Sequence, residues 1–205
     1  MVAISTLMRE SSMQDHQAAE NVHFITHLMR GELSKAHYTE YLTQLAHVYR
    51  ALERKLPDTN SLPFHAGLKR FDAISQDLEN LGVFDLETRP VLGATAEYVN
   101  RLNALGGLED VRLLAHHYTR YLGDLSGGQA IGALMKRHYG LEDSQLNFYD
   151  FSNMGDPVPI KRGYRDALDA LELDEQELAA LVQEIRYAFR LNTELFVALG
   201  NLQPV

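Results

Sequence analysis

Cysteine is absent from this chain of 205 residues, and its absence removes several kinds of chemistry. Disulfide bonds, cysteine-ligated zinc, iron–sulfur clusters, other thiolate-ligated metals and cysteine nucleophiles all require a thiol. Histidine, which occurs at 9 positions, is therefore the leading soft ligand for a metal.

Basic residues and long apolar runs are also scarce. The chain has 19 Lys and Arg against 28 Asp and Glu, and its net charge of −9 argues against nucleic acid and anionic lipid as partners. No stretch approaches the ~20 apolar residues of a membrane-spanning helix. Arg9 interrupts the N-terminal stretch before an apolar run of signal-peptide length. We therefore expect a cytoplasmic protein with no membrane association.

The chain lacks the period-two alternation of β-strands, and its apolar residues recur with helical spacing instead. That spacing is clearest over 38–56, before Pro57, and over 178–199. Asp174 and Glu177 form a capping box at the start of the last helix. The spacing predicts further helices over 3–20, 22–31, 67–81, 88–106, 109–139 and 160–171.

No linker and no tandem repeat divides the chain. The sequence therefore predicts an all-α fold with a single domain spanning residues 1–205. The least regular stretch, 141–160, is predicted to be a loop packed by its own aromatic side chains. Gly31, Gly82 and Gly140 stand where helix C-caps are expected.

Arg9, His16 and Glu20 share one face of the first predicted helix, because their spacings of seven and four residues are close to whole turns. Arg9 lies roughly 10 Å along the helix axis from His16, about the span from a bound iron to a carboxylate at the edge of a large planar cofactor. Glu20 could accept a hydrogen bond from one ring nitrogen of His16 and so fix its tautomer. A surface helix with scattered polar residues explains the same pattern and is the commoner case for a lone histidine.

Glu20 and His23 also form a Glu-x-x-His motif, which di-iron bundles use twice. The chain contains no second copy, so a di-iron centre would lack half of its ligands. His23 and His27 could chelate a metal, but without a third ligand we expect them to be polar surface residues.

Four glycines, at positions 123, 127, 128 and 132, interrupt a predicted helix. Each costs about 1 kcal/mol relative to alanine in a helix interior, so some gain must offset roughly 4 kcal/mol. Close helix packing and close approach of the backbone to a flat ligand, with a bend in the helix, explain the glycines equally well. Asp124 favours the ligand, because a carboxylate in an apolar stretch is better explained by a water network than by packing.

Residues 125–129, Leu-Ser-Gly-Gly-Gln, match the signature pentapeptide of ABC transporter ATPases. The chain has no Gly-Lys dipeptide, so the phosphate-binding loop that nucleotide hydrolysis needs is missing.

Lys161, Arg162 and Arg165 form a basic cluster in an acidic chain, which suits one or two ligand carboxylates or, equally well, a solvated helix start. Asn192 and Tyr49 lie on apolar stripes of predicted helices. We expect their side chains to be hydrogen-bonded to backbone or bound water.

Together these motifs resemble the haem oxygenase family. The resemblance rests on His16-Gln17-Ala18-Ala19-Glu20 and on the stretch from Tyr118 to Gln129, Tyr-Thr-Arg-Tyr-Leu-Gly-Asp-Leu-Ser-Gly-Gly-Gln. It continues through 49–53, 161–165 and 188–192, in order over nearly the whole chain. The long glycine-rich motif is the specific part.

The resemblance implies a helical bundle in which haem lies between the first helix and a kinked distal helix, as both substrate and prosthetic group. His16 would be the proximal metal ligand, with Glu20 as its partner. The residues that would hold the haem propionates, and so select the meso edge, are Arg9, Tyr118, Lys161 and Arg165.

On the distal side, Gly123 and Gly127 would let the backbone lie against the haem face. Asp124 would hold ordered waters that deliver protons during oxygen activation. The other members of this distal polar network would be Tyr49, Arg120 and Asn192.

The implied reaction uses O2 as co-substrate and electrons from a ferredoxin, a flavodoxin or a reductase. It cleaves a meso bridge, the alpha bridge by analogy, and gives biliverdin, ferrous iron and CO. A haem carrier or store on the same fold is the alternative, and Asp124 argues against it because a carrier needs no distal carboxylate. A thiaminase-like enzyme would need a cysteine, and a helical interaction protein would leave the glycines unexplained.

Two local features differ from the usual family pattern. Residues 156–159, Asp-Pro-Val-Pro, are an unusual approach to the basic cluster and affect the reach of Lys161. The hydrophobic C-terminal tail of the animal enzymes is absent, which suggests a short bacterial form that we expect to be a monomer.

Overall fold

The computed structural model describes residues 3–202, and within that range the chain is helical and contains no β-strand. The α-helices are α1 (Ile4–Glu20), α2 (His23–Arg30), α3 (Lys35–Glu53), α4 (Phe71–Asn80), α5 (Gly93–Ala104), α6 (Val111–His117), α7 (Gly123–Tyr139), α8 (Pro157–Asp169) and α9 (Glu175–Gly200). The short helical turns are η1 (Ala66–Leu68), η2 (Leu86–Thr88), η3 (Tyr118–Leu122), η4 (Asp143–Gln145), η5 (Asn147–Tyr149) and η6 (Ser152–Met154). The all-α prediction is confirmed.

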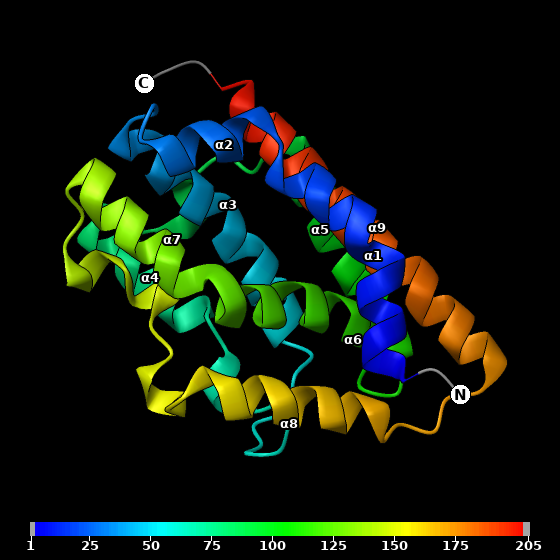
Figure 1. Ribbon diagram of the computed structural model, residues 1–205. Helices are drawn as coiled ribbons and strands as arrows, with labels where there is room; N and C mark the ends of the chain where they lie inside the picture. The colour runs from blue at the N-terminus through cyan, green and yellow to red at the C-terminus, as the bar shows by residue number, and fades with distance from the viewer. Residues whose placement is uncertain (1–2, 203–205) are drawn as a thin grey trace.

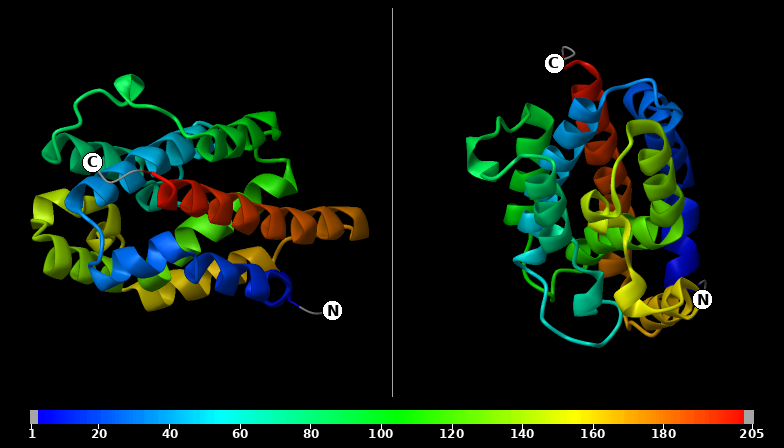
Figure 2. Two further views of the ribbon diagram at one scale, coloured as in Figure 1. Left: turned by 90° about the horizontal axis from the view of Figure 1, so that it is seen from above. Right: turned by 90° about the vertical axis from the view of Figure 1, so that its left-hand side faces the viewer.

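The distal segment α6–η3–α7 crosses the molecule: α6 and η3 lie mostly buried among the other helices, and α7 leads from them to the outer edge (Figure 1). Helix α1 packs alongside α9, and the left view of Figure 2 shows the two helices next to each other. Helix α3 packs against α4 and α5, while α8 packs against α1 and α7. The hydroxyl of Ser5 and the carboxylate of Asp169 tie α1 to α8 through a hydrogen bond of 2.9 Å.

The core contains an unusual number of tyrosines. Their hydroxyls need hydrogen-bonding partners inside the protein, because burying an unpaired polar group is costly. The fully buried tyrosines are Tyr38, Tyr49, Tyr98, Tyr121 and Tyr164. All but Tyr38 have a side-chain partner for the hydroxyl among the described residues. The core therefore carries polar networks within it, and one of them leads to the candidate site.

Most helix boundaries agree with the sequence pattern, and the exceptions have local causes. Helix α3 runs from Lys35 to Glu53 instead of 38–56, because the Ser34 side chain caps its start. Gly31 and Gly140 adopt the left-handed conformation as C-caps, with φ of 73° and 61°, as predicted. Gly82 also has a positive φ, but Leu81 is the C-cap residue there.

The predicted loop over 141–160 is wrong at its end, because α8 begins at Pro157. Asp156 caps this helix by accepting a hydrogen bond of 2.9 Å from the backbone N–H of Val158. Proline at the first helical position loses no hydrogen bond, since that N–H has no partner within the helix. Residues 156–159 are thus a helix start, and they place Lys161 within the second turn of α8.

Asp77 of α4 holds the irregular segment before α8 in place. Its fully buried carboxylate accepts hydrogen bonds of 2.8 Å from the backbone N–H and the side-chain amide of Asn147 and from the backbone N–H of Phe148. The next residue, Tyr149, packs against the glycines of α7. A single buried carboxylate therefore fixes the turn that supports the distal helix.

We predict that Asp77→Ala lowers the free energy of unfolding by about 3 kcal/mol, because it leaves buried N–H groups without an acceptor. Urea denaturation followed by circular dichroism measures this change. Glu79→Ala, an exposed carboxylate on the same helix, is the control and is expected to cost less than about 0.5 kcal/mol. Equal effects of the two substitutions would show that Asp77 does not anchor the segment.

Between residues 3 and 202, no helix combines the length and the apolar character needed to cross a membrane.

Candidate active site

Helix α1 presents His16 at its surface, as the spacing predicts. The imidazole is half exposed, and its Nδ1 lies 3.5 Å from Oε2 of Glu20. The rings of His16 and Phe189 of α9 pack edge to face, with 5.5 Å between ring centroids. Arg9, two turns earlier, is also exposed and lies near Glu10. His16 is thus a histidine backed by an aromatic ring, with a carboxylate on one nitrogen and the other nitrogen free to bind.

The other histidines of this region do not gather into a metal site. The rings of His23 and His27 stack on each other with centroids 3.8 Å apart, and Nδ1 of His27 lies 2.7 Å from Glu32. Within the described part of the chain, no group of three or more His, Asp or Glu side chains is arranged to hold a metal ion.

The distal segment is not the continuous α-helix that the sequence predicts over 109–139. Residues Tyr118–Leu122 form a π-helical turn, η3, directly before Gly123. A π-turn inserts an extra residue into a helix and is frequent at functional sites. Figure 1 shows α7 turning away from the line of α6 after this region. The predicted bend is therefore present.

The four glycines of α7 serve two different purposes. At Gly132 an added Cβ would lie 3.2 Å from Cβ of Tyr149, and at Gly128 it would lie 3.6 Å from the same ring. At Gly123 it would meet no atom within 4 Å, and at Gly127 only Ile131, at 3.7 Å. Gly128 and Gly132 thus allow close packing against Tyr149, whereas Gly123 and Gly127 expose bare backbone on an open face of the helix.

Asp124 lies on this part of α7 and is held by Tyr49 of α3. The Tyr49 hydroxyl donates a hydrogen bond of 2.5 Å to Oδ2 of Asp124. Tyr49 thus has a side-chain partner, the Asp124 carboxylate, and not a backbone group. Asn192 of α9 also has a side-chain partner, because its Oδ1 accepts a hydrogen bond from the Arg120 guanidinium. The structure brings these four predicted residues together from four separate elements.

The surroundings of Asp124 adjust its acidity. Burial raises its pKa to about 6, while the Tyr49 hydrogen bond and the charges of Arg120 and Arg70 limit the rise. A carboxyl group with this pKa exchanges a proton readily near neutral pH.

Glu53 and Arg70 belong to the same polar interior, but sequence reasoning did not select them. Oε1 of Glu53 accepts hydrogen bonds from the Tyr121 hydroxyl at 2.8 Å and from the backbone N–H of Arg70 at 2.6 Å. The charge of Glu53 raises the pKa of Asp124. Glu53 lies four residues after Tyr49 and therefore on the same face of α3. This spacing is the sequence signal that could have identified it as a neighbour of Tyr49.

The predicted propionate-binding residues come from three elements. Arg9 of α1 and Arg165 of α8 both act on Tyr118 of η3: burial raises the pKa of Tyr118, and these two guanidinium groups oppose the rise. Lys161 lies one turn before Arg165 on α8 and is partly exposed. A positively charged rim with a phenol among its members suits an anionic ligand.

Solved structures give the fold class. A heme oxygenase-1 from the cyanobacterium Synechocystis, solved in complex with heme, matches with a TM-score of 0.87 and 30% identity over 95% of this chain and 91% of that chain. A heme oxygenase from Leptospira interrogans matches with a TM-score of 0.88 and 32% identity over 96% of this chain and 99% of that chain.

Sequence comparison gives the family. The family model described as heme oxygenase matches residues 2–198. A relative named heme oxygenase from Porphyra purpurea is 32% identical over 97% of this chain and 87% of its own length. Heme oxygenase 1 of Rattus norvegicus is 33% identical over 97% of this chain and 72% of its own length. The chain belongs to the heme oxygenase family.

The raised pKa of Asp124 predicts that the free energy of unfolding depends on pH. The folded protein binds this proton more tightly than the unfolded chain, so stability falls as the pH rises from about 4 to about 6. We predict that Asp124→Asn removes this loss. The variant should gain up to about 3 kcal/mol over the wild type between pH 4 and pH 7.

Urea denaturation at several pH values measures the difference between the two proteins. Asp166→Asn, which changes an exposed carboxylate on α8, is the control and should track the wild type. A stability difference between Asp124→Asn and the wild type that does not vary with pH would contradict the assigned acidity.

Proposed function

We propose that this chain is a haem-degrading monooxygenase that binds haem as substrate and prosthetic group. It uses O2 and electrons to produce biliverdin, ferrous iron and CO. The observation that carries the proposal is the Asp124 carboxylate, held by Tyr49 beside the bare backbone of Gly123 and Gly127. Membership of the heme oxygenase family supports the same function.

The residues present fit a haem group. Helix α1 carries a half-exposed histidine, α7 leaves open space at Gly123, and the positive charges of Arg165 on α8 and Arg9 on α1 both act on Tyr118. When bound, haem supplies the redox-active iron that activates O2 and the porphyrin ring that is oxidised. The protein must then hold the group, exclude side reactions and deliver protons.

His16 would bind the iron through Nε2. Glu20 lies beside Nδ1 and favours the tautomer in which Nδ1 carries the proton, which leaves the Nε2 lone pair for the metal. Phe189 limits the rotation of the ring by packing edge to face with it. The residues that would hold the propionates are Arg9, Tyr118, Lys161 and Arg165.

Asp124 would deliver protons during oxygen activation. Its pKa of about 6 lets it gain and lose a proton at neutral pH, and Tyr49 fixes the direction of its carboxylate. Arg120 and Asn192 would place a positive charge and an amide beside it. Preorganised dipoles of this kind lower the cost of charge that develops during a reaction.

Electrons would come from a ferredoxin, a flavodoxin or a reductase, and the alpha meso bridge is the site of cleavage by family analogy. The electron donor, the monomeric state and the cytoplasmic location stay predictions.

We predict that His16→Ala still takes up haemin but loses the absorption spectrum of a histidine-ligated haem, because the propionate-binding residues are intact. Added imidazole should restore both the spectrum and turnover. Visible spectroscopy of the variant, with and without imidazole, makes this comparison. A wild-type spectrum in the variant would move the ligand to His23 or His27.

The function itself is tested by the products of Asp124→Ala and of the wild type. We predict that the wild type converts bound haem to biliverdin, whereas Asp124→Ala keeps its haem affinity but gives little biliverdin and oxidises added phenols, as a peroxidase does. Glu194→Ala, an exposed carboxylate on α9, serves as the control. Full biliverdin yield from Asp124→Ala would overturn the role of Asp124, and none from the wild type would favour the haem carrier.

A further inference from the structure

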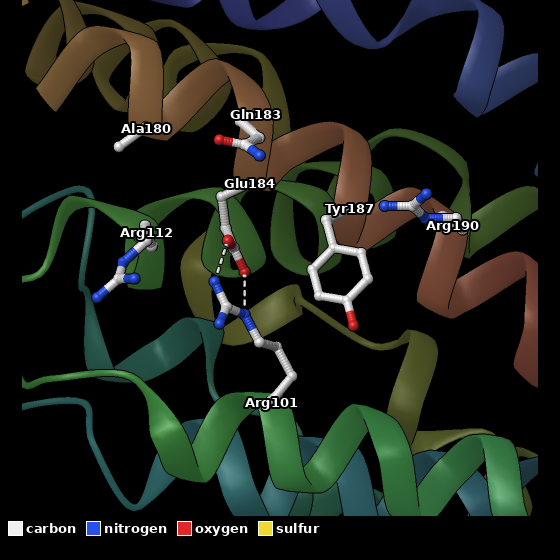
Figure 3. Close-up of a pocket in the computed structure, with 7 residues that line it drawn as sticks. All are labelled: Arg101, Arg112, Ala180, Gln183, Glu184, Tyr187 and Arg190. Atoms are coloured by element: carbon white, nitrogen blue, oxygen red, sulfur yellow. Dashed lines mark hydrogen bonds and ion pairs between the residues drawn. The ribbon is translucent and has the colours of Figure 1, made fainter. Parts of the chain in front are cut away.

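A chain of polar side chains leads from a surface cavity towards Arg120. The cavity has a volume of about 440 Å³ and lies between α9 and α5, where α6 begins (Figure 3). Glu184 of α9 forms part of its wall, although its side chain is only 5% exposed. Arg101 of α5 grips this carboxylate with two hydrogen bonds, of which the Nε to Oε1 contact is 2.8 Å. Glu184, held by Arg101, is thus the surface end of this series of polar side chains.

From Glu184 the series of polar side chains continues inwards through His116 of α6. Oε1 of Glu184 lies 2.8 Å from Nε2 of His116, which is completely buried. Nδ1 of the same ring lies 3.4 Å from the Tyr98 hydroxyl. The guanidinium carbon of Arg120 lies 5.4 Å from the centroid of the Tyr98 ring. His116 and Arg120 are four residues apart on the distal segment, so both can face Tyr98.

The charges of the outer members fix the direction of the hydrogen bonds. Burial raises the pKa of Glu184, but hydrogen bonds from His116 and Arg101 outweigh it and hold the pKa at about 2. The carboxylate is therefore ionised and can only accept. Burial lowers the pKa of His116, so its imidazole is neutral and has one N–H. That proton must be on Nε2, and Nδ1 then accepts from the Tyr98 hydroxyl.

Arg120 depends on such neutral partners. Its guanidinium donates to Asn192, and among the ion pairs of residues 3–202 no carboxylate pairs with it. Burial alone lowers the pKa of Arg120, but a hydrogen bond to Tyr98 and the negative charge of Asp124 raise it, so the guanidinium stays charged. With its proton directed at His116, the Tyr98 oxygen presents only lone pairs to the guanidinium. The orientation of Tyr98 therefore decides how well Arg120 is held.

We propose that Glu184 and His116 are positioning residues for the distal site: through Tyr98 they hold Arg120 where its positive charge acts on Asp124. Their effect on turnover rests on the proposed function, but their effect on Asp124 does not. Neither residue touches the reacting groups. The pair acts from the far end of the polar chain by fixing one histidine tautomer.

The test is Glu184→Gln, which keeps the size of the side chain but offers an amide that can donate to His116. We predict that the His116 proton then shifts towards Nδ1, that Tyr98 turns, and that Arg120 moves away from Asp124. Because the Arg120 charge lowers the pKa of Asp124, that pKa should rise above about 6. The expected change in the ionisation constant is threefold or more, which is about half a pKa unit.

Nuclear magnetic resonance of the haem-free protein measures both effects, through the imidazole nitrogens of His116 and the carboxyl carbon of Asp124 during a pH titration. Glu194→Gln, an exposed carboxylate on the same helix, is the matched control and should leave both unchanged. Tyr98→Phe is a second variant that keeps the packing and leaves Glu184 and His116 paired. It should raise the pKa of Asp124 without changing the His116 tautomer.

An unchanged Asp124 pKa in both folded variants would overturn the inference. A wild-type protein that does not degrade haem would overturn the proposed function instead, and it would leave these two measurements intact.

Discussion

The hydrogen bond from Tyr49 to Asp124 joins the central helix α3 to the distal helix α7 at the point where the candidate site is built. Tyr49 is fully buried, and its hydroxyl donates to the Asp124 carboxylate, which we propose delivers protons at the site. The same contact limits the rise of the Asp124 pKa that burial causes. One interaction therefore links the packing of the core to the acidity of the site.

The distal helix contains several features that lower its stability. Its glycines give up helix stability, and the π-turn η3 precedes them. Tyr149 offsets part of that lost stability by packing against Gly128 and Gly132. The carboxylate of Asp77 holds the segment that carries Tyr149 in place. Gly123 and Gly127 make no comparable packing contact. We propose that the approach of a flat ligand to the bare backbone offsets the stability that these two glycines cost.

Much of the fold was predictable from the sequence, because helical periodicity and end signals such as the Asp174 capping box are local. The positions of His16, Glu20 and Arg9 followed from helix geometry alone. The π-turn was not predictable, since it changes hydrogen bonding without changing the apolar pattern. The helical start at Pro157 was missed because two prolines resemble a loop when the Asp156 cap is not considered.

The polar partners inside the core were the least predictable part. The pairing of Tyr49 with Asp124 and of Arg120 with Asn192 joins residues more than 70 positions apart. Spacing along one helix shows that a polar residue faces inwards, but it does not show which side chain meets it there. Glu53, Tyr98, His116 and Glu184 were overlooked for the same reason, because each looks like an ordinary helical residue until the helices are packed.

The most direct measurement is the visible spectrum of the wild-type protein with one equivalent of haemin, followed after ascorbate is added in air. The account predicts a Soret band that decays while the broad red absorption of biliverdin grows. A bound-haem spectrum that stays constant under a competent reductant would contradict it, and the protein would then be a haem carrier with Asp124 serving another purpose.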